Sequence, residues 1–338
     1  MNSHGRAVLA LMMCLALPGR AQAGGLQRHF YATADEDSVA SLRLHARDID
    51  LASPQWFQVD AAGRLVDRAD PVVADWARRT KVRLMPLVLN QEFRPEIAHL
   101  VLTDSRTQAE LVRDLLDAGQ RLKLRGFQLD FENVPAEDRA AFTAFVRSLS
   151  GKLRSRGMRL SVAVPAPLFA VPSAANPEPL NERALAFDYR ALAAASDFLT
   201  VMTYDQHTSS DHPGPVSGRP WLEACLRRVL AEAPAKKVML GLPLYYRRFR
   251  PGGVLEGTHA EALALSRAQN ATIRRDPVEG ESTFAFDEKG APNVVWLQDA
   301  ESQRDRLELA RRLRLLGFSA WRLGHEDPEA WPYLSGRK

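Results

Sequence analysis

The chain of 338 residues is 46% hydrophobic and 25% charged, a composition typical of a globular protein with one sizeable core or two modest ones. Its formal net charge of +4 comes without any block of Lys and Arg with interleaved aromatic residues, which argues against a nucleic-acid-binding protein. The two cysteines, Cys14 and Cys225, are too few for a disulfide framework.

The first 23 residues have the features of a secretory signal. Arg6 provides a weakly basic start, residues 7–17 form an apolar run, and small residues at Ala21 and Ala23 favour cleavage after Ala23. A transmembrane anchor is the alternative, but the apolar run is too short and Arg20 interrupts its end. We therefore expect a secreted or periplasmic protein without stable membrane insertion.

The expected mature chain, residues 24–338, has a net charge of only +2 and keeps Cys225 alone, so no internal disulfide is possible. We expect this chain to be one domain and a monomer, and no pattern in it indicates a cofactor. No internal repeat, low-complexity tract or interdomain linker is present.

Short apolar runs alternate with amphipathic stretches along the mature chain, a spacing typical of repeated βα units. Strands are expected at residues 29–32, 55–60, 82–90, 126–132, 160–165, 198–205, 238–243 and 318–323. Helices are expected at residues 35–46, 71–79, 105–123, 135–156, 181–195, 221–233 and 305–316, and a Pro/Ala-rich loop at 165–179. Residues 245–298 depart from the alternation, since they hold turn sequences and the strand-like stretches 282–286 and 293–297.

Eight strands, nearly all followed by a helix, predict an α/β fold of the (β/α)8 TIM-barrel type, with a small β-rich insertion at about 245–298 after strand seven. A doubly wound open sheet is the alternative. That fold would require a Gly-rich phosphate loop after an early strand, and the sequence contains none.

Residues 126–132, with the sequence GFQLDFE, alternate strictly between apolar and polar side chains. Phe127, Leu129 and Phe131 therefore share one face, and Gln128, Asp130 and Glu132 share the other. A half-exposed antiparallel strand would show the same pattern. In a barrel, however, the polar face points into the interior, where unpaired carboxyls cost several kcal/mol, and the strand ends where barrel enzymes place their sites. The pattern then favours a catalytic acid pair.

Residues 126–132 also resemble the DGxDxDxE signature of glycoside hydrolase family 18, the chitinase-like barrels. Further segments resemble family motifs in the family's order: the MTYD sequence at 202–205 on strand six, the GLP sequence at 241–243 on strand seven, and Trp321 on strand eight. The resemblance covers nearly the whole mature chain.

Three shorter stretches are similar to the branch that contains spore-cortex-lytic N-acetylglucosaminidases. They are DFENVP at 130–135, PGPV at 213–216 leading to Trp221, and Val295-Trp296 before Asp299. Two positions depart from the chitinase pattern. Gln128 stands where chitinases have the first Asp, and the cortex-lytic branch is similar in tolerating an amide at this position. Arg125 stands where chitinases have an Asp before the glycine.

The resemblance implies substrate-assisted catalysis, in which the substrate's own acetamido oxygen attacks the sugar. Glu132 would be the general acid, with Asp130 binding the acetamido N–H, and a nearby Asp130 carboxylate is expected to raise the pKa of Glu132. Tyr204 would donate to the acetamido oxygen. Asp205 would bind near the same group, and Trp321 would form the floor of the subsite where the bond breaks.

Four further residues are grouped with the substrate-binding side chains. Gln128 shares the face of the acids, and Met202 shares the strand face of Tyr204 and is expected to pack against the catalytic strand. Tyr31 and Tyr245 lie at the ends of strands one and seven, where they could contact sugars. Each of these aromatic residues, like Tyr204 and Trp321, could equally be a packing residue.

A second cluster, Asp205, His207, Asp211 and His212, lies in one short loop. Asp and His clusters can bind a divalent metal, but this spacing matches no structural zinc pattern and the resemblance implies no metal. We expect this loop to shape a substrate subsite.

The sequence therefore predicts a secreted retaining glycosidase that cleaves β-1,4 bonds at N-acetylglucosamine residues of a chitin-type, peptidoglycan or exopolysaccharide substrate. One alternative is a catalytically silent carbohydrate-binding barrel. The other is a two-carboxylate glycosidase on non-acetylated glycan, which would need a second acid opposite Glu132.

Overall fold

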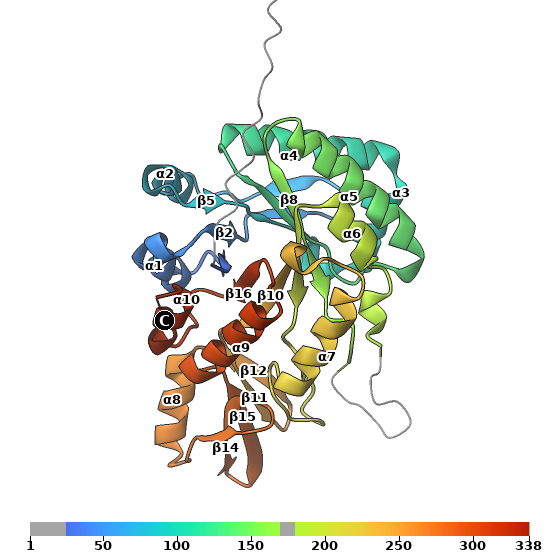
Figure 1. Cartoon of the computed structure of the whole chain (residues 1–338). Helices are drawn as coiled ribbons and strands as arrows, with labels where there is room; N and C mark the ends of the chain where they lie inside the picture. The colour runs from blue at the N-terminus through green and yellow to red at the C-terminus, as the bar shows by residue number, and fades with distance from the viewer. Residues whose placement is uncertain (1–24, 170–179, 338) are drawn as a thin grey trace, which may run out of the picture.

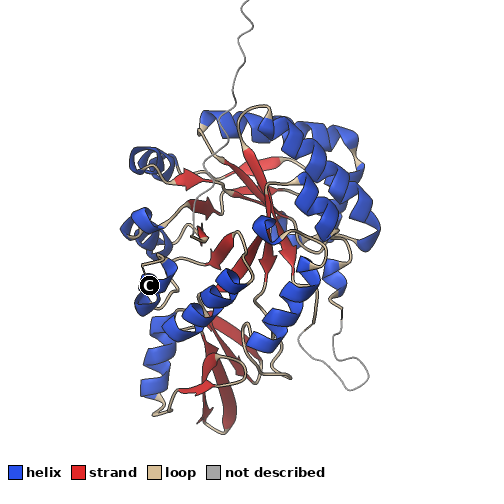
Figure 2. Ribbon diagram, in the orientation of Figure 1, coloured by secondary structure: helices blue, strands red, loops and turns tan. Residues whose placement is uncertain are grey.

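The computed structural model describes residues 25–169 and 180–337, so the expected signal at 1–23 and most of the loop at 165–179 lie outside the described residues. The described chain is a TIM barrel with its helices on the outside (Figures 1 and 2). Neighbouring strands of the main sheet follow the order β4-β3-β6-β7-β8-β9-β10-β16-β1-β2-β5, and every pair is parallel except β3 with β4.

The strands of this sheet have the following bounds. They are β1 (Gln27–Ala32), β2 (Leu51–Pro54), β3 (Phe57–Val59), β4 (Leu65–Asp67), β5 (Arg83–Leu84), β6 (Leu87–Asn90), β7 (Gly126–Asp130), β8 (Arg159–Pro165), β9 (Phe198–Met202), β10 (Val238–Pro243) and β16 (Gly317–Trp321).

The barrel closes through two strands that are each divided into two segments. β2 and β3 are the two segments of one strand, and β5 and β6 are the two segments of its neighbour. Because β2 pairs with β5 and β3 pairs with β6, these two strands are joined at both ends of the strand order, and the barrel closes between them. The expected single strand at 82–90 is interrupted at Met85 and Pro86, because proline has no N–H to give to the ladder. The strand expected at 55–60 corresponds to β3. It is preceded by another segment, β2, which alternation did not reveal because all four of its residues are buried.

The described residues form ten α-helices. Their bounds are α1 (Glu36–Leu44), α2 (Pro71–Thr80), α3 (Pro95–Thr103), α4 (Ser105–Arg121), α5 (Arg139–Arg154), α6 (Tyr189–Ala195), α7 (Arg219–Leu230), α8 (His259–Ala268), α9 (Ala300–Arg312) and α10 (Trp331–Leu334). None of the helices in the described chain has the length and apolar content needed to cross a membrane.

Aspartate caps decide where several of these helices begin. The Asp188 side chain accepts the N–H of Ala191, so α6 is much shorter than the expected helix at 181–195. The Asp299 side chain accepts the N–H of Ser302, so α9 begins at Ala300, five residues before the expected start. The short helices α3, α8 and α10 were not expected from the sequence.

The insertion between β10 and α9 is an antiparallel sheet with the order β12-β11-β15-β14-β13 (lower part of Figure 1). Its strands are β11 (Tyr246–Arg250), β12 (Gly253–Gly257), β13 (Arg274–Asp276), β14 (Glu281–Glu288) and β15 (Ala291–Leu297). The insertion has a small core of its own, formed by Tyr246, Ala262, Phe284, Val295 and Leu297. It also contains α8, so it is an α+β unit in which strands predominate.

A buried ion pair fastens this insertion to the barrel. Glu281 on β14 is fully buried and accepts from the guanidinium of Arg306 on α9 at 2.6 Å. The same carboxylate accepts the backbone N–H groups of Val216 at 2.9 Å and Ser217 at 2.7 Å. One carboxylate thus joins the insertion, α9 and the loop between β9 and α7.

We predict that Glu281→Gln lowers the free energy of unfolding by about 3–5 kcal/mol, because it leaves the Arg306 charge buried without its counter-charge. Urea unfolding measures this loss. The control is Arg312→Gln, which breaks an exposed pair with Glu223 and should cost less than about 1 kcal/mol. Similar losses in the two variants would contradict the prediction.

Candidate active site

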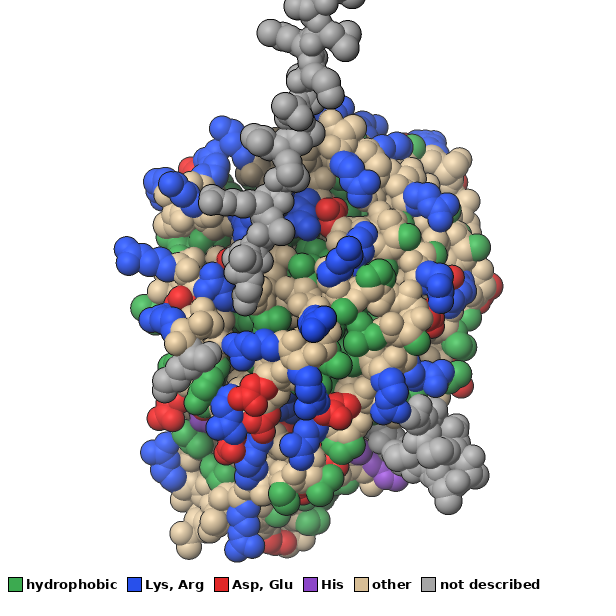
Figure 3. All heavy atoms as spheres, viewed as in Figure 1, with side chains coloured by type: hydrophobic (Ala, Val, Ile, Leu, Met, Phe, Trp, Pro, Cys, Tyr) green, Lys and Arg blue, Asp and Glu red, His purple; other side chains and the backbone are tan. Residues whose placement is uncertain are grey.

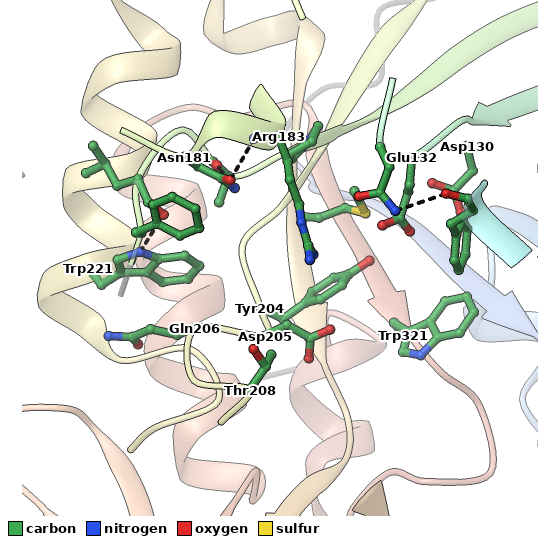
Figure 4. A pocket seen from close by; sticks show the side chains of 17 residues that line it. Asp130, Glu132, Asn181, Arg183, Tyr204, Asp205, Gln206, Thr208, Trp221 and Trp321 are labelled. Carbon is green, nitrogen blue, oxygen red and sulfur yellow. Dashed lines mark hydrogen bonds between the residues drawn. The ribbon is translucent and has the colours of Figure 1, made fainter. Parts of the chain in front are cut away.

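A cavity of about 340 Å³ opens at the carboxyl end of the barrel strands, and Figure 4 shows the side chains of the 17 residues that line it. Segments that are distant in the sequence meet there, because parallel strands all end at the same edge of the barrel. Six of the nine predicted site residues line this cavity. These are Asp130, Glu132, Met202, Tyr204, Asp205 and Trp321.

Glu132 is held in place through its own backbone. Asn90, at the end of the neighbouring strand β6, donates from Nδ2 to the Glu132 carbonyl at 3.0 Å and accepts the Glu132 N–H at 2.9 Å. On the opposite face of β7, Phe127 packs edge-on against Phe57, and beyond the strand end Phe131 stacks on Phe145. The apolar side chains therefore lie among the helices, and Glu132 points into the cavity (Figure 4).

Burial sets the protonation of the two acids. Burial, followed by the charge of Asp205, raises the pKa of Glu132 to about 7, while the charge of Arg183 acts in the opposite direction. Burial and then the charge of Glu132 raise the pKa of Asp130 well above its ordinary value of 3.8. The sequence led us to expect that a nearby Asp130 carboxylate raises the pKa of Glu132, whereas in the structure the leading cause is burial, followed by the charge of Asp205.

Asp130 is the more deeply buried acid. Only 7% of its surface is exposed, and its Oδ1 has no hydrogen-bond partner within the described chain. A buried acceptor without a partner is costly unless the group is protonated or a ligand supplies a donor. Asp130 is therefore ready to accept a hydrogen bond from a molecule that enters the cavity.

Gln128 and Tyr31 lie behind the cavity wall. The Gln128 Nε2 donates to the Tyr31 hydroxyl at 2.5 Å, and its Oε1 accepts from Ser161 at 3.2 Å. Tyr31 packs against Trp321 with ring centroids 5.4 Å apart. Both side chains are buried and neither lines the cavity, so the structure does not place them as sugar contacts.

The segment after β9 brings a phenol and a carboxylate to the other wall. Burial, together with the neighbouring Tyr31 and Asp130, raises the pKa of Tyr204 well above 10, so this hydroxyl stays a neutral donor. Asp205 accepts from the Tyr245 hydroxyl and, at 3.1 Å, from Nε of Arg247 on β11. Tyr245, predicted as a sugar contact, is instead buried behind Asp205.

The loop with His207, Asp211 and His212 makes mainly local contacts. His207 Nδ1 lies 2.9 Å from the carbonyl of His212, and Asp211 bonds to the hydroxyl of Ser209. Across residues 25–169 and 180–337, no group of three or more His, Cys, Asp or Glu side chains gathers as a metal site would require.

Several cavity residues were not predicted from the sequence. Trp221 on α7, whose Nε1 donates to the Leu168 carbonyl at 3.1 Å, lies at the end of the cavity opposite Trp321, and Arg183 lies between them (Figure 4). Trp221 carried a signal, since it follows the PGPV sequence at 213–216. Arg183 stood in no recognisable motif, and neither did Asn90, which holds the backbone of Glu132 without lining the cavity.

Comparison with known proteins identifies the family. The model of the family described as glycosyl hydrolases family 18 matches residues 73–326. The uncharacterized glycosylase YvbX of Bacillus subtilis is 24% identical over 335 residues, which cover 96% of this chain and 94% of that protein. The cortical fragment-lytic enzyme of Bacillus subtilis is 28% identical over 82% of this chain but only 65% of its own length.

Solved structures agree with this assignment. A chitinase from Chromobacterium violaceum is 27% identical and has a TM-score of 0.82, with 92% of this chain and 98% of that chain covered. The two chains therefore share their fold over nearly the full length of both.

We predict that Asp130→Asn raises the free energy of unfolding by about 1–3 kcal/mol at pH 7, because a buried ionisable group is replaced by a neutral one. The folded chain binds the Asp130 proton more tightly than the unfolded chain, so the penalty grows as the pH rises above about 4 and disappears below it. Urea unfolding at pH 4 and pH 7 measures both values. The exposed Asp211→Asn serves as control, and an equal effect of Asp130→Asn at the two pH values would contradict the prediction.

Proposed function

Since the chain belongs to glycosyl hydrolase family 18 and is therefore a glycosidase, we propose that it cleaves β-1,4 bonds at N-acetylglucosamine residues with retention, by substrate-assisted catalysis. The observation that carries this proposal is the meeting of Glu132, Asp130, Tyr204 and Trp321 in one cavity at the carboxyl end of the barrel. The substrates considered are chitin-type oligomers, peptidoglycan glycan and N-acetylated exopolysaccharide.

In the proposed reaction, Glu132 gives its proton to the glycosidic oxygen as the bond to the sugar's anomeric carbon breaks. The substrate's acetamido oxygen bonds to that carbon and forms an oxazolinium ion. Asp130 accepts the hydrogen bond of the acetamido N–H and stabilises the positive charge, and the neutral Tyr204 hydroxyl donates to the acetamido oxygen. Water, deprotonated by Glu132, then attacks the anomeric carbon and opens the oxazolinium ring. This second displacement restores the original configuration at the anomeric carbon.

Three observations support this assignment of roles. The raised pKa of Glu132, about 7, keeps much of this acid protonated near neutral pH. Within the described chain, the Oδ1 of Asp130 has no hydrogen-bond donor, and an acetamido N–H would supply one. The names of a chitinase and a cortical fragment-lytic enzyme among the relatives support an N-acetylated glycan as substrate.

The two alternatives have less support. A sugar-binding barrel without activity would not need two buried carboxyls whose ionisation is costly. A two-carboxylate mechanism would need a second free acid in the cavity. Besides Asp130 and Glu132, the acid on the described cavity wall is Asp205, which is bonded to Tyr245 and Arg247.

We also propose that the protein is exported and acts as a monomer outside the cytoplasm, with cleavage of the signal after Ala23. The composition of the first 23 residues supports export. Lys and Arg are scattered over the face seen in Figure 3, and they do not gather into one patch there, which fits an uncharged or weakly charged partner better than nucleic acid.

We predict that Glu132→Gln lowers kcat on N-acetylglucosamine oligomers by about 100- to 10,000-fold and keeps binding, because the amide cannot donate the required proton. In the unaltered protein, kcat/KM should fall as the pH rises through about 7, where Glu132 loses its proton. Steady-state kinetics and calorimetric binding measure both. Glu137→Gln, at an exposed position, is the control, and a near-normal rate in Glu132→Gln would remove Glu132 from the acid role.

We predict that de-N-acetylated oligomers are cleaved at less than about one hundredth of the rate of acetylated ones, because they lack the attacking oxygen. Chromatographic sizing of products from matched acetylated and de-acetylated oligomers tests this. Comparable cleavage of both forms would favour the two-carboxylate alternative.

A further inference from the structure

Arg183 is a cation inside the candidate active site. It lies in a short 3-10 helix, Glu182–Ala184, whose backbone is held by Asn181: the Asn181 Oδ1 accepts the Arg183 N–H at 3.1 Å, and its Nδ2 donates to the Ala166 carbonyl at 2.9 Å. Ala166 directly follows β8, so Arg183 is tied to a barrel strand. Its side chain points into the cavity toward Tyr204 and Glu132 (Figure 4).

The charge of Arg183 works against the proposed chemistry. It lowers the pKa of Glu132, which must stay protonated to act as the acid. Among the described residues that line the cavity, Arg183 is the one basic side chain, alongside the carboxyls of Asp130, Glu132 and Asp205. A neutral N-acetylglucosamine polymer would give this guanidinium hydroxyl and carbonyl partners but no counter-charge.

The position of Arg183 indicates which part of a substrate it would meet. Trp321 and Trp221 lie at opposite ends of the cavity, and Arg183 lies between them beside Glu132 (Figure 4). If one sugar stacks on Trp321, the next sugar toward Trp221, across the bond that Glu132 would protonate, passes Arg183. Guanidinium groups bind carboxylates strongly because two parallel N–H groups match the two oxygens.

We propose that Arg183 is a substrate-recognition residue that binds a carboxylate on the sugar next to the one over Trp321, as found on the lactyl ether of a muramic acid residue. This inference rests on the proposed function and narrows it, because it favours a carboxylate-bearing, peptidoglycan-type glycan over chitin. A bound carboxylate would also neutralise Arg183, so that Glu132 keeps its proton to higher pH on the anionic substrate than on a neutral one.

The experiment compares kcat/KM of the full-length protein on three matched substrates. They are peptide-free peptidoglycan fragments with free lactyl carboxylates, the same fragments with these carboxylates converted to methylamides, and fragments that carry peptide stems. We expect the unaltered protein to prefer the free carboxylate over the methylamide by roughly 10- to 100-fold, the range of a charge-assisted hydrogen bond. A preference for the peptide-bearing fragments over both would assign the carboxylate to the peptide, and the lactyl source would be overturned.

Arg183→Gln should bring the ratio of the first two kcat/KM values to about 1, and Arg183→Lys should keep part of it. Arg190→Gln, which removes the same charge from the exposed surface of α6, should keep the full ratio. In Arg183→Gln the alkaline limb of the pH profile on the methylamide should also move to higher pH, because the cation that lowers the pKa of Glu132 is gone.

A ratio near 1 in the unaltered protein, or an undiminished ratio in Arg183→Gln, would overturn the inference. Chitin oligomers separate this failure from that of the proposed function. Glu132-dependent cleavage of these oligomers without any carboxylate preference removes only the role of Arg183, whereas no cleavage of any acetylated substrate removes the proposed function itself.

Discussion

The burial of two carboxyl groups at one end of the barrel is the constraint on which the rest of the site depends. Taking Asp130 and Glu132 out of water costs several kcal/mol unless they hold protons or find donors, and the fold accepts this cost at the end of β7. The apolar side chains of the same strand offset it. Phe127, Leu129 and Phe131 are fully buried among the helices, so rotating the strand to expose the acids would expose three large hydrophobic groups instead.

Side chains from several helices, strands and loops surround this acid pair, and each makes a different contact. Asn90 fixes the backbone of Glu132, Gln128 fills the interior beneath Asp130 together with Tyr31, and Tyr204 closes the opposite wall. Gln128 matters because it is neutral. A third carboxyl at this fully buried position would add a like charge to a pair that already resists double ionisation.

The sequence predicted those parts of the site whose signal lies within one strand. The alternation in residues 126–132 separates core from cavity side chains because side chains on a strand alternate with a period of two, and this identified Asp130 and Glu132. Tyr31 and Tyr245 also lie at strand ends, but whether such a side chain faces the cavity depends on neighbouring elements that no local pattern records. Asn90, Arg183 and Arg247 reach the site from separate segments, and only the folded chain brings them there.

The fold was predictable to a similar degree. Strand and helix alternation indicated the barrel, whereas helix starts set by single caps at Asp188 and Asp299, and the division of two strands into segments, depended on particular side chains.

Arg247 shows what the contact between the insertion and the barrel means for engineering. Its guanidinium bonds Asp205 in the site and lies 3.5 Å from Glu256 on β12, so it belongs to both units at once. A chimera that exchanged the insertion for that of a relative would also exchange the partner of Asp205, and grafting this module therefore means re-engineering the cavity wall around Asp205 with it.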